Sequence, residues 1–136
     1  MASAQPASLS EDTGEYRAIM ATMQRYIDGG RTGQSDLMRP AFHPDATIVG
    51  YCGGSLLTGS IGQLFDWIDH NGPAPNITPR FASVEVVETV AVVRLEVKGW
   101  SGKMAGENAR MSDIFTLLKM PEGWCITQKT FHWHTS

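Results

Sequence analysis

Apolar residues in the first third of the chain recur at the spacing of a helix. The members of this stripe are Tyr16, Ile19, Met20, Met23, Tyr26 and Ile27. The stripe predicts a helix that begins after a cap at Asp12 and ends at Gly29-Gly30. A second, short helix is predicted to start at Ser35 and to carry Leu37, Met38 and Phe42. Because Pro44 disfavours a helical conformation for His43, helical structure should stop there.

The next segment changes to β-branched residues and turn glycines. Residues 47–52 predict a first strand, and Gly53-Gly54 predicts the turn into a short strand around Leu56-Leu57. Ser60 and Gln63 have capping-box spacing and predict a third helix. The apolar stripe of that helix is Ile61, Leu64, Phe65 and Ile68.

The remainder of the chain has the alternation of strands. After a proline-rich loop at residues 71–79, strands are predicted at 79–88, around 93–98, at 110–120 and at 124–134. Between 93 and 98, Val, Leu and Val alternate with Arg, Glu and Lys, which predicts one buried and one wet face. Helices first and an antiparallel meander last predict an α+β fold, with three helices on one face of a strongly curved antiparallel sheet.

Composition narrows the classes of function. The 136 residues suffice for one domain, which we expect at residues 12–136 after a loose tail at 1–11. The net charge is −3 and no basic run is present, which argues against a nucleic-acid partner. No apolar run approaches the roughly 20 residues of a membrane span. The polar, acidic amino terminus predicts a cytoplasmic protein. Cys52 and Cys125 are expected to be buried free thiols; the alternative is a catalytic Cys52, for which the sequence marks no partner base.

Several motifs together resemble the nuclear-transport-factor-2-like superfamily, and within it the putative lumazine-binding, polyketide-cyclase-like (SnoaL-like) branch. They are Phe42-His43-Pro44-Asp45-Ala46, a Gly50-Tyr51 strand, Phe65-Asp66-Trp67, residues 112–119, Gly123-Trp124-Cys125-Ile126 and Phe131-His132. The resemblance covers about residues 12–133. It implies a cone-shaped, cystatin-like fold with a cavity between sheet and helices, and a homodimer formed through the outer sheet face.

Ketosteroid isomerase, which shares this scaffold, offers a comparison by residue. Tyr26 in Gln24-Arg25-Tyr26 and Asp113, two residues before Phe115, resemble its two donors to a developing oxyanion. The general base of that enzyme would align with Gly50, which has no side chain. The resemblance therefore implies no ketosteroid isomerisation by that mechanism, and His43 or Tyr51 would have to take the proton instead.

Asp113 is the leading candidate for catalysis. It shares the parity of Phe115 and Leu117, so it should lie on the inner face, where desolvation would raise its pKa. The alternative is a structural carboxylate paired with Arg110 or another basic side chain, because an unpaired buried charge is costly.

Tyr26 and His43 complete the candidate catalytic set. Tyr26 could donate a hydrogen bond into the cavity or could be a core aromatic residue. His43 could be a base at the cavity mouth, or could bond nearby backbone in its turn.

Aromatic and imidazole side chains are the candidates for substrate binding: Trp67, Trp100, Tyr51, Phe115 and His132. His132 and His134 would project to one face of a strand, but a metal site needs a third ligand that the sequence does not place. We expect neither a metal nor a cofactor.

These observations favour acid–base chemistry at a carbonyl group of a small, largely apolar molecule in the cavity. Isomerisation, dehydration, cyclisation and lyase cleavage all fit this description. A non-catalytic small-molecule binder and a dimeric interaction module are the alternatives, and a cavity filled with side chains would favour the last.

Overall fold

The computed structural model describes residues 13–134, so the expected tail at 1–11 lies outside the described part of the chain. Helices α2 (Thr13–Thr32) and α3 (Ser35–Met38) and a 3-10 turn (Arg39–Ala41) come first. Strands β1 (Phe42–Cys52) and β2 (Ser55–Ser60) precede helix α4 (Gly62–Asn71). The remaining strands are β3 (Thr78–Val87), β4 (Val90–Gly102), β5 (Gly106–Met120) and β6 (Gly123–His134).

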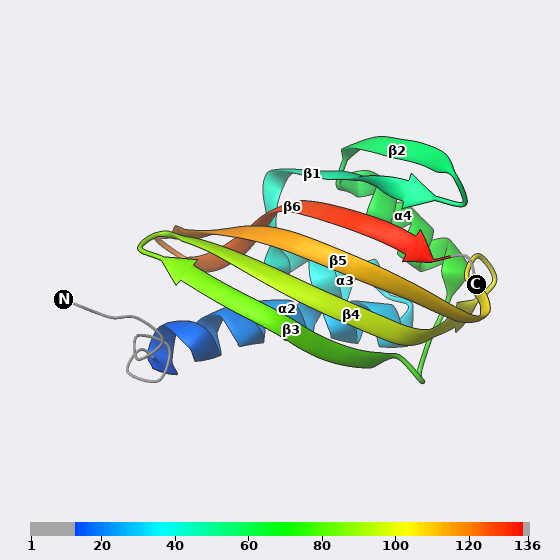
Figure 1. Ribbon diagram of the computed structural model, residues 1–136, viewed down its shortest axis with the longest axis horizontal. Helices are drawn as coiled ribbons and strands as arrows, with labels where there is room; N and C mark the ends of the chain where they lie inside the picture. Colours follow the sequence, from blue (N-terminus) through cyan, green and yellow to red (C-terminus); the bar gives the residue numbers. More distant parts are fainter. Residues whose placement is uncertain (1–12, 135–136) are drawn as a thin grey trace.

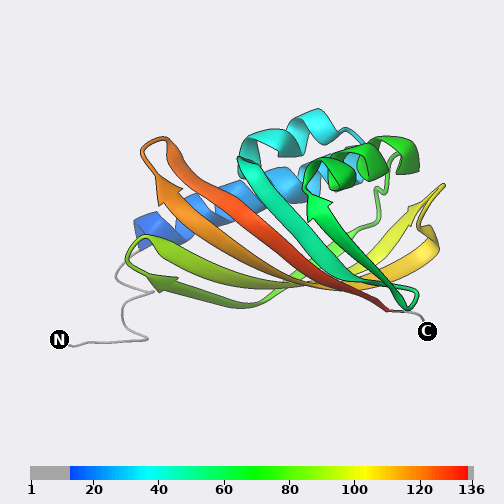
Figure 2. The same cartoon turned by 90° about the horizontal axis from the view of Figure 1, so that it is seen from above.

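The six strands form one curved sheet in the order β2-β1-β6-β5-β4-β3. The helices lie on one face of this sheet (Figures 1 and 2), so the expected α+β architecture is confirmed. The sheet is mixed, however, because β1 and β6 pair in parallel while all other neighbours are antiparallel. The prediction of an antiparallel sheet missed this pair, which joins strands about 80 residues apart and has no local signal.

Helix α2 continues through Gly29 and Gly30 instead of ending there. Both glycines permit close packing: a Cβ would lie 2.8 Å from Met38 at Gly29 and 2.9 Å from the Trp100 ring at Gly30. The chain leaves the helix at Gly33, whose φ of 69° suits a glycine cap. The glycine pair therefore serves helix packing and not helix termination.

The second helix is shorter than predicted, because Phe42 already belongs to β1. Helix α4 buries its predicted stripe, but its start is not a reciprocal capping box. The Ser60 hydroxyl accepts a hydrogen bond from the Gly62 N–H, whereas Gln63 donates to the Thr58 carbonyl. Within residues 13–134, no helix has the length and apolar character that crossing a membrane requires.

Strand β4 buries Val93, Leu95 and Val97, which confirms the predicted alternation. A register shift after Val97, with Gly99 at φ 76°, then turns Trp100 to the inner face. Beyond Trp100, the Asn71 amide donates to the Ser101 carbonyl, and its oxygen accepts from the N–H groups of Met104 and Ala105. The end of α4 thus fixes the β4–β5 turn.

Candidate functional site

A cavity of about 170 Å³ lies between the inner face of the sheet and helices α2 and α4. Five of the twelve residues that line it are aromatic: Tyr26, Trp67, Trp100, Phe131 and Trp133. Four aliphatic side chains complete the apolar lining: Ile48, Leu57, Leu64 and Met111. The polar lining residues are Cys52, Gln63 and Lys129. Cys52 and Gln63 are exposed, so they mark the side on which the cavity opens.

The tryptophans pack edge to face around the cavity. The ring of Trp67 lies 5.9 Å from that of Trp100 and 5.6 Å from that of Trp133, measured between centroids. The buried Nε1–H group of Trp100 has no hydrogen-bond partner among residues 13–134. A buried donor without a partner is uncommon in folded proteins.

Lys129 is the only cationic side chain that lines this cavity within the described chain. Its Nζ lies 2.7 Å from Oδ1 of Asp113, and the two side chains are 2% and 0% exposed. The Tyr26 hydroxyl donates to the other carboxylate oxygen over 3.3 Å. Tyr26, Asp113 and Lys129 thus form a buried polar triad, a name we keep for these three residues.

Strand register explains how β5 and β6 bring the two charges together. Asp113 is opposite Phe131, and Phe115 is opposite Lys129, so Asp113 and Lys129 are diagonal neighbours on the inner face. Tyr26 reaches them from α2, and its ring packs edge-on against Phe115 at 5.1 Å.

The surroundings of the triad are aromatic. The Nζ of Lys129 lies 4.8 to 5.7 Å from the ring centroids of Phe131, Tyr26 and Phe115, which places a cation against aromatic faces. Burial raises the pKa of the Tyr26 hydroxyl well above its ordinary value, and the charge and hydrogen bond of Asp113 raise it further. Tyr26 therefore stays protonated and remains a donor.

The structure brings together two of the three predicted catalytic residues, Asp113 and Tyr26. The partner of Asp113 is Lys129 and not Arg110, which is exposed. Tyr26 donates to Asp113, so the two do not form a pair of donors aimed at one oxyanion. The sequence reasoning missed Lys129, although Lys129, Phe131 and Trp133 have the spacing of a buried strand face.

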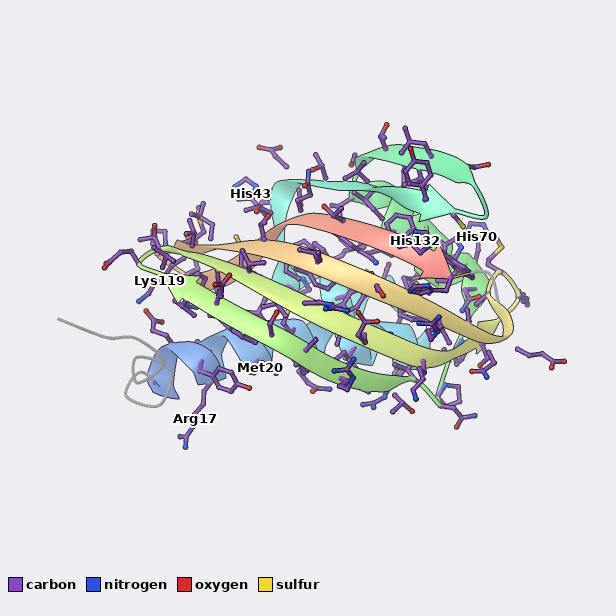
Figure 3. All side chains as sticks on the ribbon, in the orientation of Figure 1. Arg17, Met20, His43, His70, Lys119 and His132 are labelled. Carbon is purple, nitrogen blue, oxygen red and sulfur yellow. The ribbon has the colours of Figure 1, made fainter. Side chains whose placement is uncertain are left out.

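His43 lies at the start of β1 and is not among the residues that line the cavity. In Figure 3 it lies far from His132, which is near the other end of the sheet. Its Nδ1 accepts a hydrogen bond from the Asp45 N–H over 3.0 Å, which is the local backbone role considered above. The expected position at the cavity mouth is therefore not observed.

The predicted substrate-binding residues separate into two groups. Trp67 and Trp100 line the cavity, and Phe115 is buried beneath Tyr26 without lining it. Tyr51 is 52% exposed and, like His132, lies outside the cavity lining. Strand parity explains these positions: Gly50 and Phe131 face inward, so the next residues, Tyr51 and His132, face outward.

Gly50 shows why the base of ketosteroid isomerase has no counterpart. A Cβ at this position would lie 2.1 Å from the backbone oxygen of Phe131 and 2.5 Å from its ring. The parallel neighbour β6 occupies the space that a carboxylate would need.

The thiols and imidazoles do not add a metal centre. Within residues 13–134, no group of three or more His, Cys, Asp and Glu side chains is arranged to hold a metal ion. The rings of His132 and His134 do share one face, at 4.8 Å. The prediction of two buried thiols was wrong for Cys52, which is exposed, whereas Cys125 is half-buried.

Comparison with known sequences assigns the chain to a family. Residues 14–132 match the family described as "Putative lumazine-binding". The chain belongs to this family. It therefore belongs to the nuclear-transport-factor-2-like superfamily, SnoaL-like branch, as the sequence motifs predicted.

Relatives of this lumazine-binding family member include an enzyme. The chain is 31% identical over 120 residues to a protein named aldolase FrzH from Cladobotryum sp, covering 88% of this chain and 92% of that protein. It is similar to an NTF2-like protein of unknown function from Shewanella baltica OS155, with 35% identity and a TM-score of 0.83, covering 92% and 98% of the two chains. A ketosteroid isomerase-like protein from Erwinia carotovora atroseptica SCRI1043 shares the fold at 17% identity and a TM-score of 0.70, covering 90% and 98%.

Proposed function

We propose that this protein is an enzyme that uses its own side chains for acid–base chemistry on a small, largely apolar carbonyl compound. Lyase chemistry of the aldol type is the reaction we favour. The observation that carries the proposal is one cationic side chain, Lys129, in the wall of a cavity lined mainly by aromatic and aliphatic residues. The name of the relative from Cladobotryum, an aldolase, supports the same class of reaction.

Reactions that make or break a bond beside a carbonyl group develop negative charge on the carbonyl oxygen. A fixed cation in a site of low dielectric stabilises that charge far more than it would in water. Lys129 supplies the cation, and Asp113 and Tyr26 hold it in place through the triad. In this proposal Lys129 is the catalytic residue, and Asp113 acts through it.

The dimensions of the cavity limit the substrate. An apolar protein cavity of about 150 Å³ is known to hold benzene, so 170 Å³ suits a substrate portion the size of a single ring. Trp67 and Trp133 offer ring faces and edges for stacking.

A non-catalytic binding protein remains the second candidate, because an aromatic wall alone can bind a planar ligand. The interaction module is less favoured, because the cavity is not filled with side chains.

Thermal shift with single-ring carbonyl compounds tests the proposal. Benzaldehyde, acetophenone and cyclohexanone would be compared with toluene, using the wild type, Asp113→Asn and the exposed control Asp66→Asn. A ligand at 100 times its Kd stabilises the folded state by about 2.7 kcal/mol. We expect carbonyl compounds to stabilise the wild type and the control more than toluene does, and to lose that advantage in Asp113→Asn.

If toluene stabilises all three proteins as much as the carbonyl compounds do, the result would favour a non-catalytic protein that binds apolar ligands. Compounds that bind through the triad would then be assayed for turnover, including cleavage of their aldol adducts. Binding without turnover of any adduct would contradict the enzymatic proposal.

We also propose a homodimer formed through the outer face of the sheet. This face carries exposed apolar side chains on neighbouring strands, among them Val90, Val92 and Ile114. Exposed apolar groups that cluster on a sheet face are typical of protein interfaces.

A further inference from the structure

The nitrogen of Lys129 has the surroundings of a nucleophile as well as those of a cation. Its side chain is 2% exposed and lines the cavity, so the residue borders the space that a ligand would occupy and is screened from bulk water. Lysines 98, 103 and 119, by contrast, are all exposed. Desolvation in an apolar pocket is one of the ways in which proteins prepare a lysine for covalent catalysis.

We propose that Lys129 forms an imine with the carbonyl carbon of the substrate. This inference rests on the proposed function, since it assigns a covalent step to the same cavity. It goes beyond electrostatic stabilisation, because the lysine nitrogen itself becomes bonded to the substrate.

The ion pair supplies the proton transfer that the step needs. Lys129 passes one proton to the Asp113 oxygen 2.7 Å away and becomes a neutral amine. Because burying two charges away from water is costly, conversion to a neutral pair recovers part of that cost. Tyr26 continues to donate to the second oxygen of Asp113.

The neutral amine then attacks the carbonyl carbon. A C–N bond forms, the C=O π bond breaks, and the oxygen takes up a proton to give a carbinolamine. The C–O bond breaks next, and the oxygen and both of the amine's protons leave as water, which gives the neutral C=N group. Protonation of that nitrogen by Asp113 gives an iminium ion beside the Asp113 carboxylate.

The iminium ion suits this cavity and the proposed reaction. It retains the positive charge of Lys129, so Asp113 and the rings of Phe131 and Tyr26 stabilise it as they stabilise the ammonium group. When the bond between the α and β carbons breaks, its electron pair moves to the iminium group and gives an enamine. The β-hydroxyl group passes its proton to the Asp113 carboxylate and leaves as a carbonyl product. Asp113 then returns that proton to the enamine carbon, and the water formed in the first step hydrolyses the imine and frees Lys129, so no oxidant or reductant is needed.

Reductive trapping tests the proposal on the full-length wild type. The protein would be exposed briefly to benzaldehyde or cyclohexanone with sodium cyanoborohydride, digested, and mapped by mass spectrometry. We expect Lys129 to be the dominant modified lysine, ahead of Lys98, Lys103 and Lys119. Modification confined to the exposed lysines, with both carbonyl probes, would overturn the proposal.

Two variants separate the covalent step from binding. Lys129→Arg keeps a positive charge opposite Asp113 but has no amine that can form an imine, so trapping in the cavity should be lost. Lys98→Arg is the matched control and should leave trapping at Lys129 unchanged. The wild-type map decides the matter even if Lys129→Arg does not fold.

The failure of this inference is distinguishable from that of the proposed function. If the probes stabilise the wild type while Lys129 stays unmodified, the carbonyl site stands and only the imine is rejected. If the probes neither stabilise the protein nor modify Lys129, both proposals fail.

Discussion

The pair of Lys129 and Asp113 is buried, so removing one partner alone should be strongly destabilising. Lys129→Met leaves the Asp113 carboxylate buried without its partner, and we expect a loss of about 3–5 kcal/mol in the free energy of unfolding. The double variant Lys129→Met with Asp113→Leu removes both charges and should lose much less. Urea denaturation of the two single variants and the double variant measures this coupling.

An exposed ion pair provides the control for that experiment. Asp36 is 92% exposed in its pair with Arg39, so Asp36→Asn should cost no more than about 1 kcal/mol. Additive losses at Lys129 and Asp113 would contradict the strong coupling that the buried pair implies.

The lack of space around Gly50 leads to a second prediction at the level of single residues. Gly50→Ala places a Cβ 2.1 Å from the Phe131 backbone oxygen, so β1 and β6 must shift, at a cost of roughly 1–3 kcal/mol or more. Thermal unfolding of the variant and the wild type would measure this loss of stability.

Gly14→Ala is the matched control for Gly50→Ala, because nothing lies within 4 Å of its added Cβ and helix α2 should gain up to about 1 kcal/mol. If Gly50→Ala is as stable as the wild type, the steric account of the missing base is wrong.

The sequence could predict the inward position of Asp113 and the core position of Tyr26, because parity and helical spacing are local patterns. It could not predict that Lys129 pairs with Asp113. That contact depends on the register of β5 against β6, which includes a shift between Thr116 and Leu117. His43 was a candidate because an imidazole in a turn could lie at the cavity mouth, and Tyr51 was a candidate base because the family base was missing. Neither residue lines the cavity.

At the level of elements, a side chain from α4 caps the N-terminus of the short helix α3. The Asp69 carboxylate accepts hydrogen bonds from the backbone N–H and the hydroxyl of Ser35, both over 2.9 Å. The preceding Gln34 makes no side-chain cap, so Asp69 replaces it. We expect Asp69→Ala to cost about 1 kcal/mol at neutral pH, the usual value of a helix cap.

This contribution should depend on pH. The bonds from Ser35, led by its backbone N–H, lower the pKa of Asp69 below its ordinary value. The stabilisation is therefore fully present above the unfolded pKa of about 3.9, and it is lost as the pH falls through the lower, folded value. Denaturation of Asp69→Ala and wild type at neutral and acidic pH should show their difference shrinking in acid.

Element boundaries were predictable where one signal acted alone, as at the Gly53-Gly54 turn. Predicted boundaries were wrong where residues typical of a helix end are instead required by a tertiary contact. Gly29 and Gly30 looked like a helix end, but they serve the approach of Met38 and Trp100. The parallel pairing of β1 with β6 likewise depends on the path of the whole chain.

At the level of the whole molecule, the proposed dimer predicts a sensitive outer face. Ile114 is 47% exposed near the middle of β5, so Ile114→Glu would bury a charge in the interface and should shift the protein to monomer. Sedimentation velocity measures this shift. Leu37→Glu is the matched control, because Leu37 is similarly exposed on the helical side. A wild type that sediments only as a monomer would refute the dimer.

The exposed thiol at the cavity opening makes the protein suitable for optical measurement. Cys52 borders the cavity without belonging to the triad, whereas burial, aided by Glu122, raises the pKa of the Cys125 thiol and slows its reaction. A maleimide dye would therefore attach at Cys52 in preference to Cys125. Its emission would report occupancy of the cavity in real time, so binding rates could be followed for compounds that give no chromogenic product.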